Sequence, residues 1–141
     1  TINFVYEEVT EDFVFVSNIR RFQELEAAKY NRTITTSNIS SDDVYLKLDY
    51  ASHILDDEIV RDNAGLMLIN YLAQKNVNKI YLAGFDGFSA DVEQNYIDNG
   101  MAQMVNRDTM EKINSGLSRM LKKYAMLVPI EFVTESKHIT I

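Results

Sequence analysis

The chain has 141 residues, of which 46% are hydrophobic and 25% charged, and its formal net charge is -7 at pH 7. This is the composition of an ordinary globular protein, and the lack of cysteine excludes disulfides, thiolate zinc sites and cysteine nucleophiles. The acidic balance disfavours nucleic-acid binding, and no apolar run in the sequence is long enough to cross a membrane. We therefore expect a cytoplasmic protein without nucleic-acid or membrane partners.

Strand and helix patterns alternate in the first half of the chain. Runs of β-branched and aromatic residues predict four strands, at residues 2–6, 13–16, 33–37 and 44–48. A helix is predicted over residues 18–30, where Ile19, Phe22 and Leu25 recur at a spacing of three and Asn18 is a suitable cap. Residues 49–60 show no clear pattern.

The second half of the chain continues the alternation. Residues 61–76 form the strongest predicted helix, with Ala64, Leu68, Tyr71 and Leu72 on its buried face and with Met67 and Ile69 widening that stripe. A buried strand at 79–83 follows, then a polar stretch from Ser89 to Gly100 that reads as a lid or a short helix. A long helix begins near Asn106, its buried stripe comprising Met110, Ile113, Leu117, Leu121 and Tyr124. Closing strands are expected at residues 130–133 and 138–141.

Strands that alternate with helices are typical of α/β proteins. The pattern predicts a three-layer Rossmann-like sandwich with a mostly parallel sheet, in a single domain that spans residues 1–141. Because the chain begins at Thr1 and reads as strand at once, we expect it to be a fragment of a longer polypeptide.

The first candidate site is the turn Gly84–Phe88, at the carboxyl end of a predicted central strand, where α/β sheets commonly bind ligands. Gly84 and Gly87 permit positive φ angles, and Asp86 between them could bind a sugar hydroxyl or a hydrated cation. The alternative is a tight turn in which Asp86 caps its own backbone. The aromatic residues Phe85, Phe88 and Tyr96 could stack on a base or sugar, or simply pack.

The second candidate site is the start of the helix after residue 61. Asn63 and Gly65 lie where free N–H groups attract phosphate. The alternative is an ordinary helix cap at Asp62 or Asn63, with Gly65 permitting the helix to pack on a strand. Asn18, followed by Arg20 and Arg21, could bind a phosphate in the same way, although two such arginines are more often solvated.

Familiar catalytic and metal-binding patterns are missing from the sequence. The two histidines, His53 and His138, are far apart in the sequence and predict no metal site, and the dinucleotide fingerprint, the P-loop and the GxSxG elbow do not occur. The acids Asp56, Asp57 and Glu58 fit a solvated loop better than a cation site. Catalytic residues stay unknown; Asp86 or His53 would be the only candidate bases. The sequence predicts no cofactor or metal for this fragment itself.

Three stretches of the sequence carry a family resemblance. The residues Ser17-Asn18, Asp62-Asn63-Ala64-Gly65 and Gly84-Phe85-Asp86-Gly87, within an otherwise similar order from Ile2 to about Thr134, resemble a C-terminal domain of bacterial 4-hydroxy-2-oxovalerate aldolase and hydroxymethylglutaryl-CoA lyase-like proteins. In that family the domain follows a TIM barrel that carries the aldol chemistry and its divalent metal. The resemblance implies that this chain is a non-catalytic accessory domain with the barrel as its partner.

The resulting hypothesis is an accessory domain of an aldolase-like lyase that binds a small anionic ligand, phosphorylated or of the nucleotide or sugar kind. Gly84, Asp86, Gly87, Asn63 and Gly65 would form the pocket, and Asn18 could join them. A looser likeness to nucleotide-binding halves of bacterial sialyltransferases and pterin pyrophosphokinase-like proteins favours one alternative, a nucleotide-sugar or phosphosugar transferase domain. The other alternative is a dimerisation or interaction module, so a homodimer is a further expectation.

Overall fold

The structure is a computed structural model that describes residues 1–5, 10–25, 27–89 and 107–141. Backbone contacts divide the chain into two compact units. Unit 1 comprises Thr1–Leu55 and Asp62–Leu68, and unit 2 comprises Asp56–Arg61 and Ile69–Ile141. Each unit is described by itself. Among the described helices, none combines the length and the apolar character that a bilayer crossing requires.

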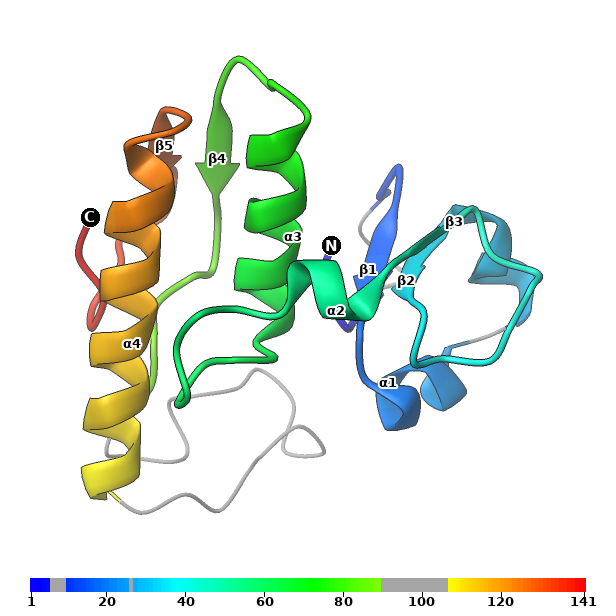
Figure 1. The fold of residues 1–141 in the computed structure, drawn as a ribbon, viewed down its shortest axis with the longest axis horizontal. Coiled ribbons are helices and arrows are strands. Elements are labelled where there is room, and N and C mark those ends of the chain that lie inside the picture. The colour runs from blue at the N-terminus through cyan, green and yellow to red at the C-terminus, as the bar shows by residue number, and fades with distance from the viewer. Residues whose placement is uncertain (6–9, 26, 90–106) are drawn as a thin grey trace. The chain divides into compact units, whose positions relative to one another are not determined.

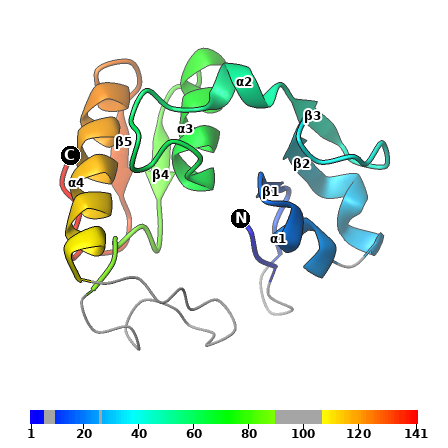
Figure 2. The ribbon, with the colours of Figure 1, turned by 60° about the horizontal axis from the view of Figure 1, so that its bottom comes forward.

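Unit 1 contains a small parallel sheet and short helices. Its elements, in chain order, are β1 (Val14–Val16), α1 (Ile19–Glu24), a 3₁₀ helix (Ala27–Arg32), β2 (Thr33–Thr36), β3 (Leu46–Leu48) and α2 (Tyr50–His53). The strand order is β1-β2-β3, and both pairs are parallel. Figure 1 and Figure 2 show these three strands side by side, with α1 directly after β1.

Unit 2 contains a second parallel sheet beside a long helix. The helix α3 (Ala64–Gln74) runs from unit 1 into unit 2, which also contains β4 (Ile80–Leu82), α4 (Arg107–Ala125) and β5 (Ile130–Phe132). β4 pairs with β5 in parallel, and Tyr81 lies opposite Glu131. Both views show α4 lying along β4 and β5 (Figures 1 and 2).

The fold class is α/β, and every strand pair in the described sheets is parallel. The described strands form one sheet of three and one of two, and the three-layer Rossmann-like sandwich stays a prediction. Tyr81 in β4 is 60% exposed, so its side of the short sheet is open to solvent rather than covered. The parallel α/β prediction is therefore confirmed at the coarse level only.

The core of unit 1 is built from β1, α1 and the loop that follows β2. Val14, Val16, Phe22 and Ile39 form the buried cluster. The central strand β2 buries the side chains of Thr33, Thr35 and Thr36 completely, and hydroxyl groups inside a protein need partners. The Thr35 hydroxyl donates to the Val16 carbonyl over 2.7 Å and so ties β2 to β1.

The predicted helix over residues 18–30 is shorter in the structure. α1 ends at Glu24, and the chain continues into the 3₁₀ helix. A continuous α-helix would place Tyr30 about 12 Å beyond Phe22 along its axis. In the structure the chain folds back, so that the rings of Phe22 and Tyr30 stack with centroids 4.8 Å apart. Burial of these two rings against each other decides where the helix stops.

Two predicted strands are wrong. Residues 2–5 contribute only an isolated bridge between Ile2 and Phe15, because Asn3 adopts a φ of 61° that interrupts extended backbone. Residues 138–141 are irregular: the N–H of His138 donates to the Asp86 carbonyl and that of Thr140 to the Ser118 hydroxyl. Side-chain and loop partners satisfy this segment instead of a strand ladder.

Both long helices bury most of their predicted stripe. In α4, four of the five predicted positions (Met110, Leu117, Leu121 and Tyr124) are buried and Ile113 is partly buried. In α3, Ala64, Met67 and Ile69 of the predicted broad stripe are buried, and Leu68, Tyr71 and Leu72 are partly buried. Leu66, which lay outside the predicted stripe, is completely buried as well, because the first turn of the helix is enclosed on all sides. The lid predicted after Ser89 lies outside the described residues.

Candidate functional site

Polar side chains gather at the carboxyl ends of β1, β2 and β3. The Asn38 amide donates to the Ser17 carbonyl over 3.0 Å and accepts from the Thr36 hydroxyl over 2.6 Å. The Asp49 carboxylate accepts from the backbone N–H of Ser52 over 3.0 Å and also from its hydroxyl. These hydrogen bonds hold the pKa of Asp49 below its ordinary value. The groups at this edge of the sheet thus bind one another and fix the strand ends.

Asn18 caps α1 and the two arginines after it are paired. The Asn18 side-chain oxygen accepts from the backbone N–H groups of Arg20 and Arg21 at 2.9 and 3.4 Å. The two guanidinium groups form ion pairs with Glu24, at 3.2 and 2.8 Å respectively. The hydrogen bond from Arg21, more than that from Arg20, lowers the pKa of Glu24. The fork that could bind a phosphate therefore has an internal carboxylate as its partner.

Asn63 is the cap of α3. Its side-chain oxygen accepts from the N–H of Leu66 over 3.1 Å, and its carbonyl accepts from the N–H of Met67 over 2.9 Å. Gly65 is buried in the first turn of the helix. These bonds are those of an ordinary N-terminal cap. A ligand role for Asn63 and Gly65 stays a prediction.

The turn after β4 is held against α4 by a close backbone approach. Gly84 and Gly87 have φ angles of 64° and 81°. A Cβ atom at Gly87 would lie 2.7 Å from Oδ1 of Asn114 and 2.8 Å from Cγ1 of Ile139, whereas none of the described atoms lies within 4 Å of one at Gly84. The Asn114 amide accepts from the N–H of Phe88 and donates to its carbonyl, both over 2.8 Å. Only glycine fits at position 87, and Asn114 fixes the turn.

The segment after β5 lies against the same turn. The Gly84 N–H donates to the Thr134 hydroxyl over 2.8 Å, and the Asp86 carbonyl accepts from the N–H of His138 over 2.9 Å. The Asp86 side chain is partly buried. Because β4 and β5 are parallel, their carboxyl ends lie at one edge of the sheet, which is where ligands bind in open α/β sheets.

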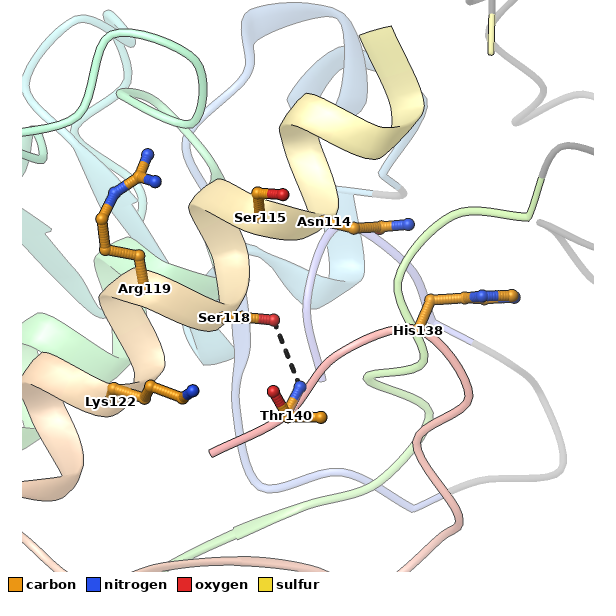
Figure 3. A pocket seen from close by; sticks show the side chains of 7 residues that line it. All are labelled: Asn114, Ser115, Ser118, Arg119, Lys122, His138 and Thr140. Atoms are coloured by element: carbon orange, nitrogen blue, oxygen red, sulfur yellow. Dashed lines mark hydrogen bonds between the residues drawn. The ribbon is translucent and has the colours of Figure 1, made fainter. Parts of the chain in front are cut away.

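A hollow of about 500 Å³ opens beside this edge, between α4 and the C-terminal segment (Figure 3). Its lining consists of Asn114, Ser115, Ser118, Arg119, Lys122, His138 and Thr140. In the close view Lys122 extends from α4 toward the C-terminal segment, and Arg119 points to the other side of the helix. The Ser118 hydroxyl accepts from the N–H of Thr140 over 3.2 Å and so joins the two walls.

The charge of the hollow is positive. Arg119, whose side chain is 61% exposed, donates from Nε to the Asp57 carboxylate over 2.9 Å and forms a second contact through Nη2. The Asp57 side chain is only 4% exposed. Burial acts to raise the pKa of Asp57, but hydrogen bonds from Arg119 and the backbone outweigh it and lower that pKa. Lys122 has no carboxylate partner among the described residues, so its charge faces the hollow.

The sequence-predicted site residues fall into two groups. Gly84, Asp86 and Gly87 lie in one turn of unit 2, whereas Asn18, Asn63 and Gly65 belong to unit 1. A single pocket that joins Asp86 to Asn63 therefore stays a prediction. The turn contacts the hollow through two of its lining residues, Asn114 and His138.

Sequence reasoning missed the residues on α4 that line the hollow. Asn114, Ser118 and Lys122 recur at a spacing of four, so they share one face of the helix. This polar stripe is visible in the sequence beside the apolar stripe that was used to predict the helix. What the sequence does not tell is that the segment around His138 and Thr140 returns to lie beside it.

Comparison of the chain with protein-family models, with curated proteins and with solved structures finds no match. Within the described ranges, no group of three or more histidine, aspartate and glutamate side chains is arranged to hold a metal ion. A function is therefore inferred from the geometry and chemistry of the described side chains.

Proposed function

We propose that this domain binds a small phosphorylated ligand in the hollow between α4 and the C-terminal segment. The observation that carries the proposal is the lining itself: every one of its seven residues can donate a hydrogen bond, two are cationic, and none is a carboxylate. The sequence holds 21 acidic residues against 14 lysines and arginines, so a hollow lined only by donors departs from the average surface.

The donors supply what a phosphate group requires. Lys122 provides a charge that no described carboxylate neutralises, and charge-assisted hydrogen bonds are the strong ones. Ser118 uses its oxygen to accept from the N–H of Thr140, which leaves its hydroxyl hydrogen to donate. Thr140 and His138 add further donors from the opposite wall.

The accessory-domain role that the resemblance implies is part of the same proposal. The parallel α/β architecture and the ligand hollow at a strand end support a domain that binds a ligand without carrying out chemistry. The aldol chemistry is assigned to the barrel partner that the resemblance implies. The chain's own contribution would be affinity for the phosphorylated end of a ligand.

Lys122→Ala is the test, with inorganic phosphate as the probe. Titration of the ¹⁵N-labelled chain at constant ionic strength is expected to shift the amide signals of Ser118, His138 and Thr140. The substitution is expected to weaken phosphate binding at least tenfold, because a hydrogen bond to a charged group contributes about 1.5–3 kcal/mol.

Lys123→Ala is the matched control. Lys123 is the next residue of α4, is also exposed and lies outside the lining of the hollow. The control is expected to leave phosphate binding nearly unchanged. If the two substitutions weaken binding equally, the effect is one of net charge and the proposed site is wrong. Unshifted amide signals at millimolar phosphate would also overturn the proposal.

A further inference from the structure

A second hollow lies on the same helix, next to the first. It has a volume of about 470 Å³, and its lining consists of Ile59, Asp108, Glu111, Lys112, Ser115 and Arg119. Ser115 and Arg119 line both hollows, so the two are neighbours that share a wall. Their chemistry differs, since the second hollow has two carboxylates and an exposed apolar side chain, Ile59.

Asp57 holds the shared wall and one side of the second hollow in place. One oxygen of its carboxylate accepts from the backbone N–H groups of Ile59 and Val60, at 3.0 and 3.3 Å. Its other oxygen accepts from Arg119. Val60 in turn packs against α4, 3.0 Å from the place that a Cβ atom on Gly116 would occupy. The loop and the helix are therefore fixed to each other where the hollows meet.

We infer that the two hollows bind one ligand, a pentose or hexose phosphate, with the phosphate in the first hollow and the sugar hydroxyls in the second. This inference rests on the proposed function. Carboxylates that accept from vicinal hydroxyl groups are a common way to bind a ribose, and Ile59 offers an apolar surface to the C–H face of the ring.

The spacing along α4 limits the size of the ligand. Glu111 and Ser118 are separated by an axial rise of about 10 Å. That is the length of a sugar monophosphate rather than of a dinucleotide. The charged side chains of the two hollows favour the same orientation of the ligand, with its phosphate in the first hollow. Asp108 and Glu111 would repel a phosphate, and Lys122 would attract it.

Ribose 5-phosphate and inorganic phosphate are the two probes, and calorimetric dissociation constants are the measurement. The wild-type chain is expected to bind ribose 5-phosphate at least tenfold more tightly than inorganic phosphate. Glu111→Gln is expected to reduce that ratio to threefold or less and to leave the affinity for inorganic phosphate unchanged. Glu135→Gln, at an exposed position outside both hollows, removes the same charge and is expected to keep the ratio.

The outcomes separate the inference from the proposal beneath it. If both probes bind with equal affinity at the residues of the first hollow, the sugar inference is wrong and the phosphate site stands. Failure of both probes to bind removes both. A ratio that Glu111→Gln and Glu135→Gln lower equally would attribute the effect to overall charge and overturn the inference. If Glu111 only stabilises the helix, Glu111→Gln is expected to lower the melting temperature and to leave the ratio of the two affinities unchanged. That result would overturn the inference.

Discussion

The two parallel sheets end in polar edges of opposite character. At the carboxyl ends of β1, β2 and β3, the side chains of Asn38 and Asp49 are engaged with neighbouring residues of the same edge. At the carboxyl ends of β4 and β5, backbone bonds and Asn114 fix the turn, and the donors Lys122 and Ser118 remain available beside it. Polar groups that hydrogen-bond to one another at a sheet edge stabilise the fold, whereas an edge with unused hydrogen-bond donors can bind a ligand.

The comparison depends on glycine at position 87, where substitution is expected to have the largest effect. Gly87→Ala combines a positive φ with a Cβ atom 2.7 Å from Asn114, so we expect a loss of about 2–4 kcal/mol in the free energy of unfolding. Gly84→Ala has a similar φ but open space, and we expect about 1–2 kcal/mol. Urea unfolding of both variants measures the difference. Equal losses would show that Gly87 is not packed against α4.

Asp57 provides the next largest effect. Asp57→Ala removes the partner of Arg119 and the acceptor for two backbone N–H groups, so we expect a loss of about 2–3 kcal/mol by urea unfolding. Asp57→Asn keeps the oxygen that accepts from the backbone and is expected to lose less. A larger loss in the Asn variant than in the Ala variant would contradict this account.

The same carboxylate predicts a pH dependence. Its pKa is lowered in the folded state, so its stabilising contribution is complete above the ordinary value of 3.8 and is lost as the pH falls through the lower folded value. The wild-type chain should therefore lose more stability than Asp57→Asn when the pH is taken from 5 to below 3.8. Parallel stability curves for the two chains across that range would refute the linkage.

Asp49 at the other edge predicts the smallest effect and the sharpest contrast. Asp49→Ala removes the cap of α2, and we expect a loss of about 1 kcal/mol in unfolding free energy, with Asp49→Asn close to wild type. Neither variant should change the affinity for inorganic phosphate, measured calorimetrically, because the partners of Asp49, Ser37 and Ser52, belong to its own edge. A changed phosphate affinity would indicate that the ligand binds at the edge of β1, β2 and β3, and it would contradict the proposed site.

Local patterns in the sequence predicted the elements well where one interaction dominates. The buried strands around Val14 and Ile80 and the apolar stripe of α4 follow from the period of the hydrophobic residues. Asn18 and Asn63 were recognised as possible caps, and each accepts from backbone N–H groups at the start of its helix. These features depend on residues that are near one another in the chain.

Tertiary contacts decided the rest. The stacking of Tyr30 on Phe22 shortened the first helix, and the bonds of His138 and Thr140 to distant residues replaced an expected strand. The sequence by itself determined the α/β class, the acidic net charge and the turn at Gly84 and Gly87 after β4. These properties depend on composition, on local pattern and on local backbone preference. Only the fold brought the C-terminal segment beside the polar stripe of α4, because a hollow is made by contacts between residues far apart in sequence.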